Sequence, residues 1–236
     1  MRGLRILLIV VVVLGILFVA ADRVAVYFAE DEAAKKIKSS QNLSEKPDVS
    51  IKGFPFLTQV ADSKLDEVHV NLDGVSASAG GRSIRVTKLD ASLHDVKINS
   101  SFSSATADHA TGSAHISYED LSKAADAGVK VSYGGRDKDG KSQVKVSAGV
   151  PVPVLGRTVE RSVLSTVTMV NGNTIRLHAD SVPGQEIPGL EGLIRKKIDF
   201  DRRIDGLPRG IKLDKITTNE QGVDISVTGS HVELAG

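Results

Sequence analysis

Residues 222–229 read GVDISVTG and alternate apolar with polar side chains without a break. Successive side chains of a β-strand point to opposite faces, so Val223, Ile225 and Val227 share one face. One apolar and one polar face indicate an antiparallel sheet that is covered on one side and solvated on the other. Alternating apolar positions recur in segments 49–51, 65–72, 84–98, 144–146, 163–170, 175–177 and 232–234.

Helical spacing replaces this alternation in a few segments. Residues 22–40 have the pattern of an amphipathic helix, in which one face is expected to hold Val24, Tyr27, Phe28, Ala34 and Ile37. Ser117 and Asp120 fit a capping box at the start of a second, short helix that Gly128 closes. Between residues 188 and 200, a third helix is expected to carry an apolar stripe.

These patterns predict an α+β fold with a long, curved, mostly antiparallel sheet and a few helices that cover its apolar face. The composition does not change in a way that would mark a second domain. Residues 22–236 are therefore predicted to form a single domain.

The first residues carry a targeting signal. Arg2 and Arg5 precede the run Ile6–Ala21, which contains 16 residues and no charge. A helix of that length spans about 24 Å. Residues 1–21 are therefore either a signal peptide that is cleaved near Ala21 or a signal anchor that stays in the membrane. In both cases the rest of the chain lies outside the cytoplasm and is associated with the cell membrane or released from it.

The composition excludes several classes of protein. The net charge of the 236 residues is only +1, which argues against a nucleic-acid partner. The chain has no cysteine, so thiol catalysis and Cys-ligated zinc are excluded. With six Phe, three Tyr and no Trp, a surface that stacks bases or sugars is not expected.

The chemical motifs do not indicate an enzyme. Residues 135–142 read GRDKDGKS and match the phosphate-loop pattern, but the alternating residues 143–147 follow where a helix is required. A polar hairpin turn is the better interpretation. The histidines are scattered and no G-x-S-x-G elbow is present. No catalytic residue, metal site or cofactor is predicted.

Two further segments have both a structural and a functional interpretation. Residues 53–58, GFPFLT, place Phe54 and Phe56 around a proline. They form either a rigid turn that closes one end of the core or an apolar lip at a cavity mouth or membrane contact. The basic residues Arg195, Lys196 and Lys197 form either a salt-bridged face or a rim that meets anionic lipid headgroups.

Several of these segments resemble the LmeA-like family, cell-envelope phospholipid-binding proteins of actinobacteria that include the mycobacterial lipomannan elongation factor. The resemblance is most specific in GFPFLTQ at 53–59, and it extends over nearly the whole chain after Asp22. It rests on AEDEAA at 29–34, LDEV at 65–68, ISYEDL at 116–121, GLPRGI at 206–211 and GVDISVTG at 222–229.

The resemblance implies an elongated tubular lipid-binding fold, similar to bactericidal/permeability-increasing protein domains, in which a curved sheet wraps against a long helix. It also implies phospholipid binding and a role in making or maintaining envelope lipoglycan, without established catalysis. The expected partners are phospholipids, the outer face of the plasma membrane and envelope glycan-assembly proteins.

Apolarity and position select the candidate site residues. The lipid is expected to contact Phe54, Phe56, Leu193, Ile194 and Ile198, and the headgroup is expected to meet Arg195, Lys196 and Lys197. The predicted function is that of an extracytoplasmic lipid carrier or lipid-sensing factor. One alternative is a membrane-tethered scaffold for envelope-building enzymes with no lipid in its groove. A glycan-processing enzyme, which needs a pair of carboxylates in a cleft, is ranked last.

Overall fold

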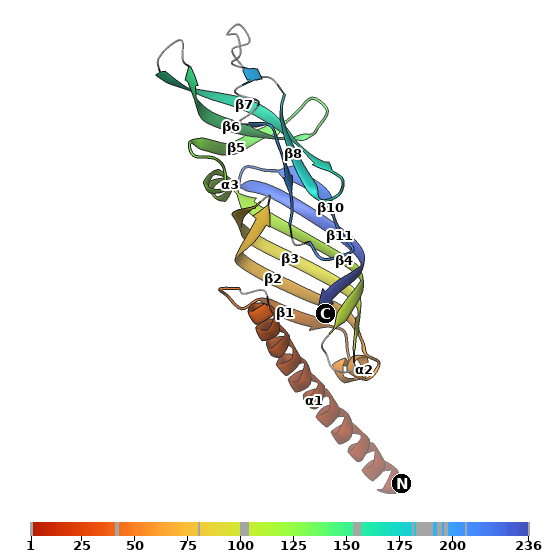
Figure 1. The fold of residues 1–236 in the computed structure, drawn as a ribbon. Coiled ribbons are helices and arrows are strands. Elements are labelled where there is room, and N and C mark those ends of the chain that lie inside the picture. Colours follow the sequence, from red (N-terminus) through yellow and green to blue (C-terminus); the bar gives the residue numbers. More distant parts are fainter. Residues whose placement is uncertain are drawn as a thin grey trace. The chain divides into compact units, whose positions relative to one another are not determined.

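The chain has an α+β structure in which antiparallel strands predominate, as the sequence predicts. The computed structural model describes residues 2–40, 43–79, 81–99, 104–152, 157–180, 182, 191–192, 195, 198–205 and 207–235. Within these residues the helices are α1 (Arg2–Ser40), α2 (Phe56–Ala61) and α3 (Tyr118–Ala124) (Figure 1). The strands are β1 (Asp48–Lys52), β2 (Lys64–Ala79), β3 (Arg82–Ile98), β4 (Ala105–Ser117), β5 (Val129–Arg136), β6 (Ser142–Val152), β7 (Arg157–Val170), β8 (Thr174–Ala179), β9 (Phe200–Arg203), β10 (Ile211–Thr218) and β11 (Gly222–Ala235).

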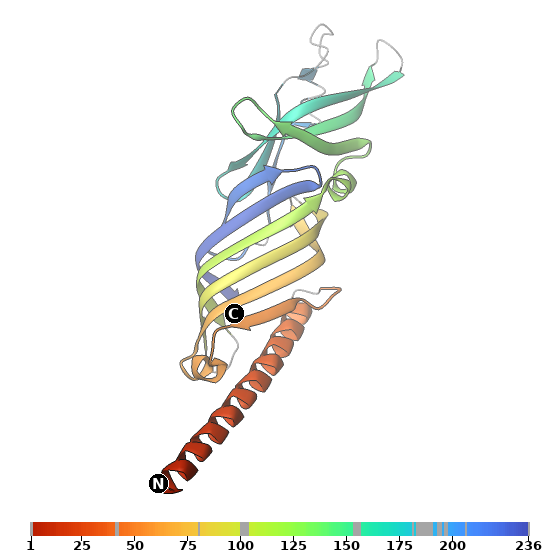
Figure 2. The same ribbon diagram turned by 180° about the vertical axis from the view of Figure 1, so that it is seen from behind.

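The strands form two sheets rather than the one long sheet that alternation alone suggests. The order is β1-β2-β3-β4-β11-β10 in the six-stranded sheet and β5-β6-β7-β8-β9 in the five-stranded sheet (Figures 1 and 2). Between β4 and β5 the chain forms α3 and then turns at Gly128, whose φ is +80°. This interruption lets β5 begin a new sheet with β6.

The chain divides into two compact units. The first unit contains Met1–Leu72, Ala91–Ala110 and Ser230–Gly236, and the second contains Asp73–Asp90 and Thr111–Gly229. Strands β2, β3, β4 and β11 each contribute residues to both units.

The second unit has a closed apolar core. Val144 and Val146 of β6 are 3% and 2% exposed, and they occupy the alternating inward positions that the sequence predicts. They belong to one cluster of buried side chains: Val86, Ile116, Val129, Val144, Val146, Ala148, Val163, Leu177, Ala179, Val182, Ile198, Leu213, Val223 and Ile225. Each fully buried Val or Leu contributes roughly 1.5–3 kcal/mol to folding relative to an exposed one.

The segment that matches the phosphate-loop pattern is a hairpin turn, which confirms the sequence interpretation. It joins β5 to β6, whose residues pair up to Arg136 and Ser142. The carboxylate of Asp137 accepts hydrogen bonds from the backbone N–H groups of Asp139 (2.8 Å) and Lys141 (2.7 Å). Two of the loop amides are therefore already bound to a carboxylate of the loop itself.

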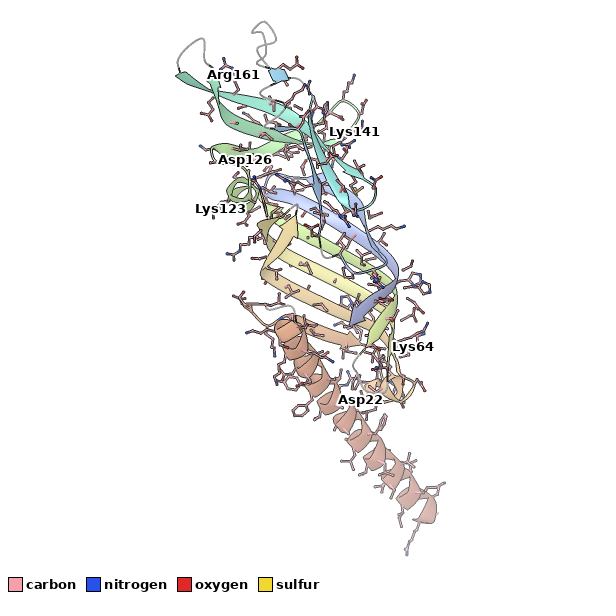
Figure 3. The ribbon with its side chains drawn as sticks, viewed as in Figure 1. Asp22, Lys64, Lys123, Asp126, Lys141 and Arg161 are labelled. Atoms are coloured by element: carbon pink, nitrogen blue, oxygen red, sulfur yellow. The ribbon has the colours of Figure 1, made fainter. Side chains whose placement is uncertain are left out.

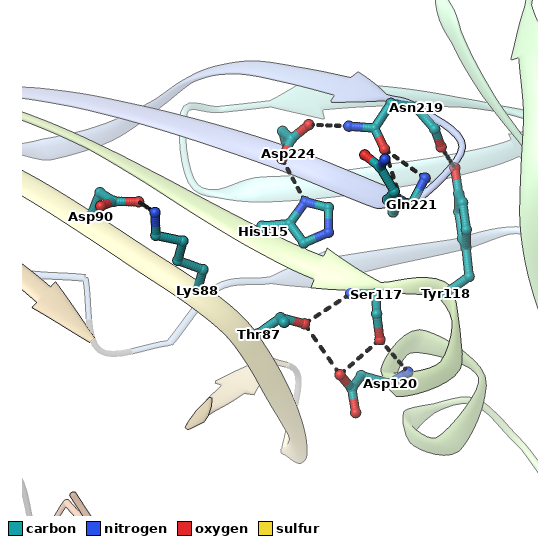
Figure 4. A network of polar contacts seen from close by, with 11 residues as sticks. Thr87, Lys88, Asp90, His115, Ser117, Tyr118, Asp120, Asn219, Gln221 and Asp224 are labelled. Carbon is teal, nitrogen blue, oxygen red and sulfur yellow. Dashed lines mark hydrogen bonds and ion pairs between the residues drawn. The ribbon is translucent and has the colours of Figure 1, made fainter. Parts of the chain in front are cut away.

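The N-cap half of the predicted capping box at α3 is also confirmed, whereas the N–H of Ser117 bonds Oγ1 of Thr87. Ser117 is the N-cap residue, and its Oγ accepts a hydrogen bond of 3.1 Å from the N–H of Asp120. The next residue, Tyr118, donates its hydroxyl to the carbonyl of Asn219 at 2.8 Å (Figure 4). Burial raises the pKa of Tyr118 to about 12, so the hydroxyl remains a donor at physiological pH.

This contact continues into a polar network of the second unit. Asn219 donates its Nδ2 to one carboxylate oxygen of Asp224 at 2.6 Å, and His115 Nδ1 lies 2.7 Å from the other (Figure 4). The network joins β4, the start of α3 and the β10–β11 turn. Each member bonds to at least one other member, so the network holds these elements together.

In the first unit, the second half of α1 packs against β1, but not with the face that the sequence suggests. The buried side chains of α1 are Asp22, Val26 and Ala34. Tyr27 and Phe28 are instead 68% and 65% exposed, and Val24 is exposed with them. The expected apolar face is therefore wrong for these three residues, whereas Ala34 of the same predicted face is buried.

Candidate functional site

The first half of α1 presents an apolar surface that no other part of the described chain covers. It is long and apolar enough to cross a membrane, and none of its apolar window is buried. The uncharged run Ile6–Ala21 ends at Asp22, which is the first acidic residue of the chain.

Asp22 joins α1 to the short helix α2. Its carboxylate is 0% exposed, accepts a 2.8 Å hydrogen bond from the N–H of Leu57 and pairs with Arg23 at 2.6 Å (Figure 3). Pro55 precedes α2 and supplies no side-chain cap, so Asp22 satisfies an amide of the first turn from another helix. These hydrogen bonds offset the desolvation of the buried carboxylate.

The turn at residues 53–58, here called the aromatic turn, is fixed by contacts on both sides. Gly53 has a φ of +96°, and a Cβ there would lie 2.5 Å from Nε2 of Gln59. The side chain of Gln59 is buried, donates to the carbonyl of Lys52 and accepts from the N–H of Asp66 at 2.8 Å. The aromatic turn is therefore built around a glycine that has no room for a side chain.

The two phenylalanines of the aromatic turn have opposite environments. Phe56 is 6% exposed and packs inside the first unit, whereas Phe54 is 57% exposed. The guanidinium carbon of Arg23 lies 5.1 Å from the centre of the Phe54 ring, a cation–π contact. The turn thus presents one aromatic ring outward beside the end of the apolar run of α1.

An apolar strip lies on one face of the sheet in the first unit. Ile51 pairs with Val68 and Val49 pairs with Val70, so these side chains point to the same face. Val49 is buried, but Val68, Val70 and Leu72 are only half-buried. We call Ile51, Val68, Val70, Leu72 and Leu93 the apolar strip; they are all half-buried.

The opposite face of the same strands is polar, and the sequence did not reveal how its groups combine. Nε2 of His69 lies 2.7 Å from a carboxylate oxygen of Glu67, and Nδ1 of His69 lies 3.2 Å from Oγ of Ser92. This contact places Ser92 on the His69 face, so Leu93 belongs to the apolar strip. The i, i+2 spacing of Glu67 and His69 was the signal for their shared face, but only strand pairing brings Ser92 to them.

The predicted site residues of segment 193–198 have mixed outcomes. Leu193, Ile194, Lys196 and Lys197 lie outside the described residues. Ile198 is 2% exposed and belongs to the core of the second unit.

Arg195 is already engaged by partners of its own segment. It pairs with Glu191 at 2.9 Å and with Asp199 at 3.4 Å, and it donates to the carbonyl of Ala179 at 3.0 Å. The hydrogen bond that Arg195 donates to Glu191 raises the pKa of Arg195 further above its ordinary value. Arg195 thus takes part in the salt-bridged arrangement that the sequence offered as its structural interpretation.

Metal chemistry has no ready set of ligands here. Within the part of the chain that the structure describes, no group of three His, Cys, Asp or Glu side chains is placed to hold a metal ion.

The sequence missed the apolar strip as a site, because the half-burial of its side chains depends on which parts of the apolar face the rest of the chain covers.

Comparisons with known proteins give one match. The model of the LmeA-like phospholipid-binding family matches residues 20–228. The search of curated proteins and the search of solved structures returned no match. The family match begins where the apolar run of α1 ends and includes the aromatic turn and the apolar strip. Because it covers most of the chain, the protein belongs to the LmeA-like phospholipid-binding family.

Proposed function

We propose that this protein is an extracytoplasmic, non-enzymatic phospholipid carrier or lipid-sensing factor that supports the assembly or maintenance of envelope lipoglycan. The observation that carries the proposal is the half-buried apolar strip of the first unit, in a chain that belongs to a phospholipid-binding family. Since β2, β3, β4 and β11 contribute to both units, residues 22–236 act as one lipid-binding domain.

The strip has the chemistry that an acyl chain requires. A 16-carbon chain left in water costs on the order of 12 kcal/mol, at about 0.8 kcal/mol per methylene. Val68, Val70 and Leu72 offer aliphatic surface that is not yet covered, so contact with an acyl chain removes apolar area from water on both sides. The polar face with Glu67 and His69 remains solvated.

Among the predicted contact residues, Phe54 is the one whose side chain is available to lipid. Phe56 and Ile198 are buried and support the fold around the site. Lys196 and Lys197 remain the candidates for the headgroup, since Arg195 has carboxylate partners.

The protein remains anchored by residues 6–21 in this proposal. Helix α1 runs unbroken from Arg2 to Ser40, across the point near Ala21 where cleavage would occur. Arg2 and Arg5 lie on the cytoplasmic side, so the domain faces the opposite side of the membrane. N-terminal sequencing of the protein from its native membrane should begin at or near Met1; a sequence that begins at Asp22 contradicts retention.

Photolabelling tests lipid binding directly. The full chain is reconstituted in phosphatidylcholine vesicles that contain a phosphatidylcholine with a diazirine on its acyl chain, and labelled peptides are identified by mass spectrometry. Label is expected in the peptide that carries Val68, Val70 and Leu72, in addition to residues 6–21, which any spanning helix would show.

Label confined to residues 6–21 would contradict the proposal and favour the alternative, a membrane-tethered scaffold that binds envelope-building enzymes.

A further inference from the structure

Four exposed apolar side chains lie near the end of the apolar run of α1. Val24, Tyr27 and Phe28 follow it on the helix, and Phe54 of the aromatic turn lies beside Arg23 of the same helix. The rings of Tyr27 and Phe28 contact each other edge to face, with centroids 6.0 Å apart. We call Val24, Tyr27, Phe28 and Phe54 the aromatic collar.

The exposure of Phe54 is built into the structure. Asp22 holds the start of α2, Gln59 holds both sides of the aromatic turn, and Phe56 anchors the turn inside the first unit. With its neighbours fixed in this way, the backbone on both sides of Phe54 is held in place and its ring is 57% exposed. An exposed aromatic ring on a fixed backbone fits an apolar partner.

The dimensions of α1 identify that partner. The run Ile6–Ala21 spans about 24 Å, which is about 6 Å less than the hydrocarbon core of a bilayer. The next four or so residues of the helix supply the difference, so Val24 reaches the edge of the hydrocarbon core and Tyr27 and Phe28 reach the headgroup layer. Aromatic residues are enriched at that depth because their rings are apolar and their edges polar.

The charged residues beside the aromatic collar are arranged so that the collar can contact the membrane. Asp22 and Arg23 neutralise each other at 2.6 Å, and Asp22 is fully buried by protein. Arg23 also lies over the Phe54 ring, where its charge can still reach the phosphate layer.

We propose that the aromatic collar sits at the boundary between acyl chains and headgroups of the membrane that α1 spans, with Phe54 inserted as a second attachment beside the helix. The proposal rests on the retained anchor described above. A spanning helix alone can rotate about its axis, whereas a helix with a laterally attached ring cannot rotate freely. The collar therefore fixes which side of the first unit faces the lipid surface.

The absence of Trp from the sequence gives a direct test, because one substitution creates a single fluorescent probe. The full-length Phe54→Trp variant is reconstituted in vesicles of phosphatidylcholine and phosphatidylglycerol, with bromine placed at increasing depth along the acyl chains. Blue-shifted emission is expected, with the strongest quenching by lipids brominated near the glycerol end.

Ser39→Trp is the matched control. Ser39 is exposed on the same helix, about 26 Å farther along its axis than Asp22, and should give red-shifted emission with little quenching. Equal emission and quenching for the two probes would overturn the proposal.

If circular dichroism shows that Phe54→Trp does not fold, Tyr27→Trp provides a second probe. It should also give blue-shifted emission and strong quenching near the glycerol end. Emission and quenching equal to those of Ser39→Trp would overturn the proposal. Failure here is distinguishable from failure of the proposed function, because quenching reports on Phe54 and Tyr27 whereas photolabelling reports on the 68–72 peptide, and each result can be negative while the other is positive.

Discussion

The two units use the same sequence pattern in different ways. In the second unit, alternating valines such as Val144, Val146 and Val163 are almost completely buried among side chains of the same unit. In the first unit, Val68, Val70 and Leu72 occupy equivalent alternating positions and remain half-buried. Alternation therefore defines an apolar face, but whether that face becomes a core or a binding surface depends on what the rest of the chain supplies to cover it.

The largest expected difference between the units is in stability. Val146→Ala should lower the free energy of unfolding by about 2–3 kcal/mol, because it removes buried methyl groups and leaves a cavity. Val70→Ala should lower it by about 1 kcal/mol or less, since its side chain is partly solvated already. Urea unfolding followed by circular dichroism measures both, and equal losses would show that the strip is an ordinary core.

A charge on the apolar strip should affect lipid binding more than stability. Val70→Asp is expected to reduce acyl-chain photolabelling of the 68–72 peptide by about tenfold, because a carboxylate facing the acyl chain loses hydration. The matched control is Asn71→Asp, which adds the same charge one residue away on the opposite face. A similar loss of photolabelling in Val70→Asp and Asn71→Asp would mean that the added charge acts from either face, and that the apolar strip is not the lipid site.

A smaller effect is expected when low pH weakens the contacts that hold the segment between α1 and β1. Asp31 bonds to Lys35 at 2.6 Å and also to Lys46, and these contacts lower its pKa from 3.8 to about 2. A depressed carboxylate pKa stabilises the folded state above pH 3.8, and the contribution is lost as the pH falls toward 2.

Hydrogen exchange of segment 43–52 should therefore accelerate through that acid range. Asp31→Asn should show the faster exchange already at neutral pH and lose that part of the pH dependence. If hydrogen exchange of segment 43–52 has the same pH dependence in Asp31→Asn as in the unchanged protein, other carboxylates cause the acceleration in acid.

The smallest effect is expected from the polar face of the first unit. Glu67, His69 and Ser92 lie in the order of an acid, a base and a hydroxyl, but on an open strand face. Ser92→Ala should leave lipid photolabelling unchanged. Turnover of a phospholipid ester that depends on Ser92 would contradict a non-enzymatic function.

Local patterns predicted much of the fold. The alternating strands, the Asp137 turn and the Ser117 cap all depend on neighbours within a few residues, and all are confirmed. The division into two sheets was not predictable in this way. It depends on which strands pair across long separations, as β4 does with β11.

The candidate site was less predictable for the same reason. Phe54 and Phe56 flank one proline, yet one is exposed and the other buried, because Asp22 holds α2 from 35 residues away. Tyr27 and Phe28 are exposed although helical spacing placed them on the predicted apolar face, because nothing in the described chain covers that part of α1. Ile198, which the sequence placed in the apolar stripe of a helix and among the lipid contacts, lies in the core of the second unit.

The place of β11 has a consequence for biosynthesis. It lies between β4 and β10, so β4 keeps one edge of unpaired backbone groups until the 14 residues of β11, near the C-terminus, have been made. Such edges promote aggregation. Until β11 pairs with β4, this open edge is therefore an expected site of aggregation during folding.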